Sequence, residues 1–162
     1  MRVNAPNADS GGILGIRPWI EHGGFALNRA GQWTFVDMPT VVVKGKRSRL
    51  GAGRPPKPKL DLHALFKLVG RLKPDQSFLE ADAPHPGEGS RRDAHAYGAI
   101  EMALIANGVR YAEVPWPVWK KAVPSTRAKE LFKAAGFQPE PGKAEAMLIA
   151  LYGAEQQQAG AP

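Results

Sequence analysis

Short apolar runs bounded by glycine and proline make up the first third of the chain. The run at 13–16 (ILGI) is ended by Pro18, which predicts a buried strand and not a helix. Two strand-like segments, Gly23–Asn28 and Trp33–Met38, flank the sequence RAGQ, which is typical of a hairpin turn. These segments predict three adjacent antiparallel strands, the third of which is extended by Thr40–Val43.

Helical periodicity becomes the dominant pattern after residue 60. Apolar residues in Leu60–Leu72 follow the spacing of an amphipathic helix, with Asp61 as its N-cap. Ala94–Asn107 predicts a second helix, which is closed by Gly108. Two short strands are expected at Ser77–Glu80 and Tyr111–Val114, and three further helices at about 119–123, 126–135 and 143–152.

The order of these elements is three strands, a helix, a strand, a helix, a strand and more helices. It predicts an α/β fold, a ribonuclease-H-like sandwich in which helices flank a mixed five-stranded sheet of three antiparallel and then two parallel strands. A chain of 162 residues fits one such domain. We expect this domain over 12–153, with a flexible N-terminus at 1–11, a basic loop at 44–59 and a flexible tail at 154–162.

Composition narrows the classes of function. The chain has no cysteine, which excludes disulfides, thiolate zinc sites and cysteine nucleophiles, so metal chemistry has to use carboxylates or histidines. No stretch approaches the ~20 apolar residues of a membrane span, and the start MRVNAPNADSGG lacks the apolar core of a secretory signal. We therefore expect a cytoplasmic protein with no membrane partner. The formal net charge of +7 attracts polyanions and favours a nucleic-acid partner.

The positive charge is concentrated between residues 44 and 59, where KGKRSRLGAGRPPKPK contains no acid. Its second half is similar to part of an AT-hook, in which Gly-Arg-Pro lies in the narrow minor groove of A·T-rich DNA. The alternative is a flexible basic linker that contacts phosphates without regard to base sequence. Both interpretations predict nucleic-acid binding by the basic residues of this loop, which are Lys44, Lys46, Arg47, Arg49, Arg54, Lys57 and Lys59.

The chain also contains six segments that, in consecutive order, resemble those of RuvC-type Holliday-junction resolvases from phages and bacteria. They are GIRPW, VDMPT, FLEADAPHPGEG, AYGAIEMAL, VPWPVWKKAV and GKAEAMLIALYG, and they cover nearly everything from Gly12 to Gly153. The resemblance implies a homodimer joined through the helix at 94–107 and a branched DNA substrate. It also implies phosphodiester hydrolysis with two Mg²⁺ or Mn²⁺ ions, held by carboxylates that converge from two strand ends and the last helix.

Two of the implied carboxylates are present and are the catalytic and metal-ligating candidates. Glu80 matches the acid at the end of the family's fourth strand, and Glu145 matches an acid on the last helix. The resemblance implies another acid three or four residues before Glu145. The chain has Pro141 and Gly142 there, and Glu140 is the nearest substitute.

The central aspartate of the family's first strand is replaced by Arg17. A guanidinium cannot be neutralised by deprotonation, and it repels a divalent cation ~4 Å away by several kcal/mol at an effective dielectric of about 20. We expect Arg17 to pair with Glu80 or Glu145, or to contact a phosphate itself. The alternative that would preserve the metal site is a relocated ligand, which would have to be Glu21, His22 or Asp82.

Further candidates for contacts with DNA lie elsewhere in the matching segments. Arg91 and Arg92 fall in the predicted loop after the fourth strand, and Lys120 and Lys121 match the family's Trp-Lys-Lys. Trp119 is interpreted as a core or dimer-interface residue.

The sequence leaves three functions open. The first is a RuvC-like protein that binds branched or structured DNA, has impaired or absent nuclease activity and requires no cofactor. The second is an active Mg²⁺- or Mn²⁺-dependent Holliday-junction endonuclease. The third is a regulatory dimer that uses the resolvase scaffold to bind a protein partner.

Overall fold

The computed structural model describes residues 12–42, 57–81, 91–136 and 140–160. Its main sheet consists of β1 (Ile13–Arg17), β2 (Gly24–Arg29), β3 (Gln32–Asp37), β6 (Gln76–Ala81) and β7 (Tyr111–Pro115). The strand order is β3-β2-β1-β6-β7, in which β1 pairs antiparallel with β2 and parallel with β6. Because β3 is antiparallel to β2 and β7 is parallel to β6, the predicted mixed sheet is confirmed.

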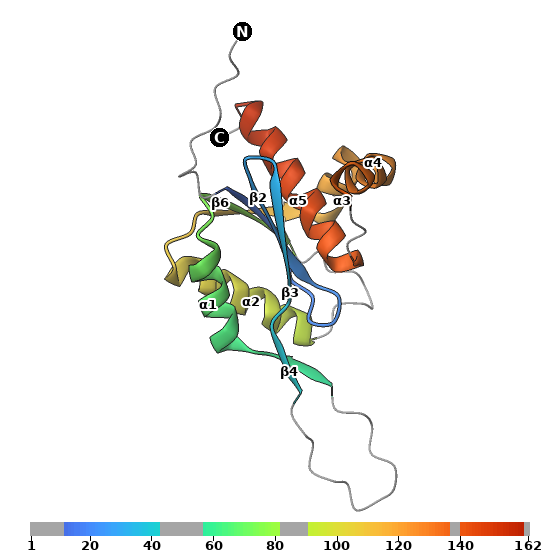
Figure 1. Ribbon diagram of the computed structural model, residues 1–162. Helices are drawn as coiled ribbons and strands as arrows, with labels where there is room; N and C mark the ends of the chain where they lie inside the picture. The colour runs from blue at the N-terminus through green and yellow to red at the C-terminus, as the bar shows by residue number, and fades with distance from the viewer. Residues whose placement is uncertain (1–11, 43–56, 82–90, 137–139, 161–162) are drawn as a thin grey trace, which may run out of the picture.

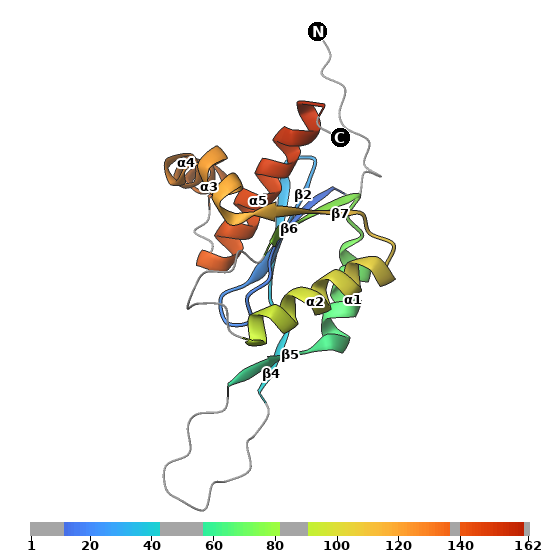
Figure 2. The same cartoon turned by 180° about the vertical axis from the view of Figure 1, so that it is seen from behind.

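Helices cover both faces of this sheet, as Figures 1 and 2 show. One face carries α1 (Leu62–Leu72) and α2 (Arg91–Ala106), and the other carries α3 (Trp116–Ala122), α4 (Ser125–Ala135) and α5 (Pro141–Gln158). The predicted N-cap of α1 is confirmed, because Asp61 Oδ1 accepts a hydrogen bond from the Ala64 N–H at 2.9 Å. The architecture is the α/β sandwich that the order of elements predicts.

Alternation along the strands sends side chains into two separate cores. In β1, Leu14 and Ile16 pack in the core shared with α1 and α2, so Arg17 points to the opposite face, toward α5. In β6, Leu79 belongs to the first core and Phe78 to the core shared with α3 and α5. The residue after Leu79 in this strand therefore also faces α5.

Helix α5 approaches β1 very closely because residue 15 is glycine. A Cβ added to Gly15 would lie 1.9 Å from the carbonyl oxygen of Ala146 and 2.6 Å from the amide nitrogen of Ala150. No side chain fits there unless the helix or the strand moves. This contact fixes the start of α5 over the end of β1, where the candidate site lies.

The segment that follows β3 differs from its prediction. Thr40–Val43 does not extend β3, because β4 (Thr40–Val42) pairs antiparallel with β5 (Pro58–Leu60) in a separate two-stranded sheet. Residues 58 and 59 of the predicted basic loop are thus in a strand. Proline is tolerated at the first position of a strand, where its missing N–H costs little.

Two other predictions are corrected at helix ends. The expected flexible tail from residue 154 is wrong as far as Gln158, because α5 continues and its Glu155 pairs with Arg127 of α4 at 2.5 Å. Arg91 and Arg92 form the first turn of α2 and do not lie in a loop.

The expected flexible N-terminus at 1–11 and the basic-loop positions at 44–56 lie outside the described residues. Within the described residues, no helix has the length and apolar character needed to cross a membrane.

Candidate functional site

The carboxyl ends of β1 and β6 bring two charged side chains together. The parallel register ends with Ile16 beside Leu79, so the next residues, Arg17 and Glu80, are neighbours at the edge of the sheet. Both point toward α5, which contributes Glu145 from its first turns. We refer to Arg17, Glu80 and Glu145 as the strand-end cluster.

Arg17 is held by partners on two sides. Its Nη1 forms an ion pair with Glu145 Oε2, and its side chain is only 14% exposed. Its Cζ lies 4.9 Å from the centroid of the Trp19 ring, within the range of a cation–π contact. Burial lowers the pKa of Arg17, whereas the carboxylate of Glu80 raises it, and an arginine stays charged throughout the physiological range. The structure therefore contains the ion-pair alternative that the sequence predicts for Arg17.

Glu80 is the buried member of the cluster, with 4% of its surface exposed. Its Oε1 accepts a hydrogen bond from Trp19 Nε1 at 3.3 Å. Burial raises the pKa of Glu80, and this exceeds the opposing effects of Arg17, the indoles of Trp19 and Trp119, and Lys120. The indole of Trp119 faces the carboxyl without reaching hydrogen-bond geometry, and Glu80 Oε2 has no hydrogen-bond partner among the described residues.

Glu145 is not the free surface residue that its helix position alone would suggest. Its side chain is 23% exposed and faces Arg17 across the interface between α5 and β1. The structure thus brings together both acids that the sequence singles out, together with the arginine that replaces the third.

Of the two positions where the missing acid could lie, Gly142 is closed by backbone, whereas Pro141 is exposed. Gly142 is buried at the start of α5, and a Cβ added to it would lie 1.9 Å from the carbonyl oxygen of His22. The nearest substitute, Glu140, is exposed and pairs with Lys143 at 3.3 Å, and Lys143 also pairs with Asp37 of β3 at 2.7 Å. These contacts direct Glu140 to Lys143.

The residues of the strand-end cluster do not fit a divalent metal. In the described part of the chain, no three side chains of aspartate, glutamate or histidine gather around one point. The guanidinium of Arg17 contacts the carboxylate that would serve as a ligand, and at ~4 Å it repels each unit of positive charge by about 4 kcal/mol at an effective dielectric of 20. Of the proposed replacement ligands, Glu21 and His22 are exposed, and Asp82 lies outside the described residues.

The basic residues predicted to contact DNA are described only in part. Lys57 and Lys59 are exposed at the β4–β5 ribbon, and Lys120 and Lys121 are exposed on α3. Lys120 Nζ lies 4.4 Å from the centroid of the Trp116 ring and is close enough to Glu80 to lower its pKa. Trp119 is 1% exposed and packs in the core, as one of its two interpretations predicts. Only the backbones of Arg91 and Arg92 are described, and Lys44, Lys46, Arg47, Arg49 and Arg54 lie outside the described residues.

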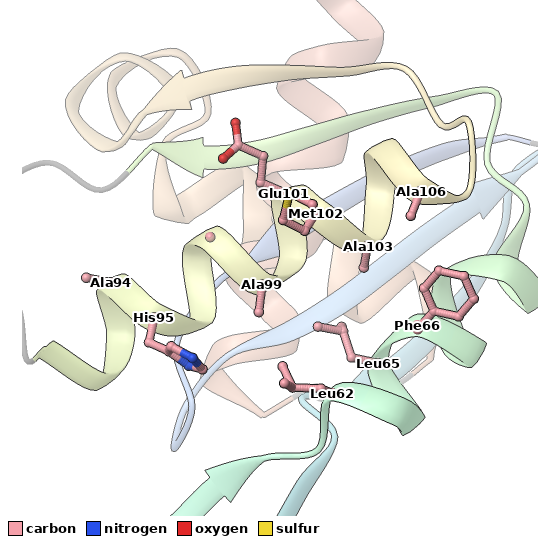
Figure 3. A pocket seen from close by; sticks show the side chains of 11 residues that line it. Leu62, Leu65, Phe66, Ala94, His95, Ala99, Glu101, Met102, Ala103 and Ala106 are labelled. Atoms are coloured by element: carbon pink, nitrogen blue, oxygen red, sulfur yellow. The ribbon is translucent and has the colours of Figure 1, made fainter.

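An apolar groove of about 670 Å³ lies on the other face of the molecule, between α1 and α2. Figure 3 shows Leu62 and Phe66 of α1 facing the groove opposite α2, which contributes His95 and Met102. These apolar side chains are exposed to an unusual degree, with 63% for Met102, 53% for Leu62 and 46% for Phe66. This is the helix pair that contains the predicted dimer helix.

Sequence reasoning did not identify the role of Trp19 in the strand-end cluster or the backbone contact that closes Gly142. Trp19 contacts both Arg17 and Glu80, and its only signal in the sequence is its place in the segment GIRPW, two residues after Arg17. The closure at Gly142 depends on the backbone at His22, which is distant in sequence and leaves no local signal.

Comparison with known proteins identifies similar structures but no match by sequence. No protein-family sequence model matches the chain, and no curated protein matches it by sequence. Among solved structures, RuvC of Thermus thermophilus is similar, with a TM-score of 0.58 and 18% identity over 91% of this chain and 96% of that one. T. thermophilus RuvC in complex with Holliday junction substrate gives a TM-score of 0.62 and 21% identity, over 91% and 95% of the two chains. The chain therefore has the fold of RuvC along nearly its whole length.

Proposed function

We propose that this protein binds branched or otherwise structured DNA of the Holliday-junction type and has impaired or absent nuclease activity. The observation that carries the proposal is the Arg17–Glu145 ion pair beside Glu80, on a fold shared with RuvC. A RuvC structure with that fold is a complex with a Holliday junction. The scaffold supports the binding function, and the reversed charge at the end of β1 argues against hydrolysis with metal ions.

Charge supports the choice of DNA as the partner. The formal net charge is +7, and the basic sequence at 44–59 contains no acid. Lys57 and Lys59 are exposed where this sequence joins the ribbon, and Lys120 and Lys121 are exposed on α3, with Lys120 close enough to Glu80 to lower its pKa. Phosphate contacts by such residues supply most of the affinity for DNA and make it salt-dependent. Cytoplasmic localisation is part of the same proposal.

A homodimer is the proposed form of the binding protein. The groove between α1 and α2 exposes Met102, Leu62 and Phe66, and exposed apolar patches of this kind mark interaction sites. A second copy of the chain would cover this face and present two basic surfaces to one junction. The same groove also supports the alternative of a regulatory protein that binds a different polypeptide.

The proposal is tested with a synthetic four-way junction and a linear duplex of the same length. Gel shifts in EDTA at ~150 mM salt, where weak phosphate contacts are screened, should show tighter binding to the junction. Incubation with Mg²⁺ or Mn²⁺ should leave the junction uncut. Replacing Lys120 and Lys121 by serine should weaken binding, whereas the same change at the exposed pair Lys67 and Arg71 of α1 is the charge-matched control.

Each outcome selects one function. Efficient symmetric nicking that Glu80→Gln abolishes would establish the active endonuclease, for which the retained Glu80 and Glu145 are the supporting observation. Equal, weak binding to both DNAs would shift the function to the regulatory dimer. An equal effect of the α3 and α1 variants would remove Lys120 and Lys121 from the DNA interface.

A further inference from the structure

Two carboxylates converge on one edge of the sheet from different elements. Glu80 comes from β6 and is almost fully buried, and Glu145 comes from α5. A buried negative charge beside a second, partly buried one is unfavourable unless a cation lies between them or one of them is neutralised. A positive group at this point would stabilise both acids in their charged forms.

Arg17 is placed to supply that positive group. It lies beside Glu80 in the parallel register and forms its ion pair with Glu145, so it faces a carboxylate on each side. Trp19 fixes this arrangement, since its ring faces the guanidinium and its N–H donates to Glu80. The close approach of α5 to β1 at Gly15 places Glu145 within reach of Arg17.

The start of α5 shows that this arrangement is built into the backbone. Any side chain at Gly142 would collide with the carbonyl oxygen of His22. The edge has thus changed in two independent ways, one in its charge at Arg17 and one in its shape at Gly142. Neither change depends on the other, because they involve different contacts.

We propose that Arg17 is a built-in cation that takes the structural place of a divalent ion, joining β1 and β6 to α5 through Glu145 and Glu80. The edge then holds its two acids together in the complete absence of divalent metal. This inference goes beyond the proposed function, because it holds whether or not the protein binds DNA. Its test uses no DNA, so its failure is separate from a failure of the DNA-binding proposal.

The test compares thermal unfolding of the full chain and three Arg17 variants in EDTA and in excess Mn²⁺, with potassium chloride to match ionic strength. The melting temperature of the native chain should be the same in both. Arg17→Met should lower it by roughly 5–10 °C in both conditions, because the buried Glu80 and the partly buried Glu145 lose their counter-charge. Arg17→Lys keeps the charge and should retain most of the stability that Arg17→Met loses. Arg17→Asp should be weakened in EDTA and should recover in Mn²⁺ but not in potassium chloride.

Three results would overturn the inference. One is a native chain that Mn²⁺ stabilises beyond its ionic-strength control, which would mean that the edge already takes a metal. Another is an Arg17→Met variant as stable as the native chain. The third is an Arg17→Lys variant that loses as much as Arg17→Met, because packing of the guanidinium and not its charge would then hold the edge. The methionine and lysine variants decide the matter even if Arg17→Asp fails to fold.

Discussion

The closed backbone at Gly142 gives a sharp prediction about the missing acid. Gly142 is the second residue of α5 and is buried, and an added Cβ would lie 1.9 Å from His22 O, 2.6 Å from His22 C and 3.2 Å from Gly23 C. Contacts this short cannot be relieved by rotating a side chain, because all three atoms belong to the backbone. The substitution Gly142→Ala therefore has to move either α5 or the segment at 22–23.

The size of the effect follows from two opposing contributions. Forcing extra atoms into a packed site typically costs about 1–3 kcal/mol. Replacing glycine by alanine within a helix regains roughly 0.5–1 kcal/mol through the unfolded chain, and less at the helix start. The free energy of unfolding should therefore fall by about 1–2 kcal/mol, which corresponds to roughly 2–8 °C in melting temperature for a chain of this size.

Urea unfolding followed by tryptophan fluorescence measures this loss, and Gly98→Ala is the matched control. Gly98 is also a helical glycine, in α2, but no atom lies within 4 Å of its added Cβ. Gly98→Ala should be neutral or stabilising by up to about 1 kcal/mol, at a protein concentration held fixed. If Gly142→Ala behaved like Gly98→Ala, position 142 would be open to a side chain and the steric reasoning would be wrong.

Two other features of the structure make separate predictions. The hydrogen bond to Glu101 at 2.5 Å raises the pKa of Tyr111 to about 12, and burial together with the hydrogen bond to Glu113 raises the pKa of Tyr97. The stabilisation that Tyr111 gains from its raised pKa is complete below the pKa of an unfolded tyrosine, about 10, and is lost as the pH rises through the folded pKa. Tyr111→Phe should therefore remove one tyrosinate from an ultraviolet titration near pH 12. It should also make the fall in the free energy of unfolding above about pH 10 smaller. Met102→Glu puts a charge on the exposed apolar face of α2 and should convert a dimer to a monomer in light scattering, while an unchanged mass would exclude that face as the interface.

The sheet could be predicted from the sequence because each strand is a short apolar run with a clear stop. Pro18 ends the first run, and the turn at 30–31 separates the next two, where Ala30 and Gly31 both have positive φ. The β4–β5 ribbon could not be predicted in the same way. Its strands have three residues each and are separated by 15 positions, so neither carries a periodic signal of its own.

The end of α5 was missed because composition was given more weight than helix propensity. The polar sequence after Gly153 is typical of a disordered tail, yet alanine, glutamate and glutamine are all good helix formers. The helix needs only a short extension beyond its packed part, which the ion pair between Glu155 and Arg127 supports. An exposed pair of this kind contributes little by itself, so propensity is the larger cause.

The candidate site was predictable where it depends on strand ends and not where it depends on contacts between distant segments. Counting along β1 and β6 places Arg17 and Glu80 on the same edge and the same face, which two periodic strands and a parallel register determine. The choice of Glu145 as the partner of Arg17 depends on how closely α5 approaches Gly15. That distance is a property of packing, so the sequence left two partners open.

The charge at Arg17 and the closure at Gly142 have different consequences for any attempt to restore a metal site. Arg17→Asp removes the repulsion at once, since it acts through an electrostatic term that a single side chain controls. It leaves the His22 carbonyl against the start of α5, so an acid at position 142 has no place to enter. Two-ion hydrolysis needs several carboxylates at fixed separations, and a site with Asp at position 17 would still lack one of them. We therefore expect Arg17→Asp to regain metal binding without regaining cleavage. This outcome would separate the effect of the charge at position 17 from the effect of the steric closure at Gly142.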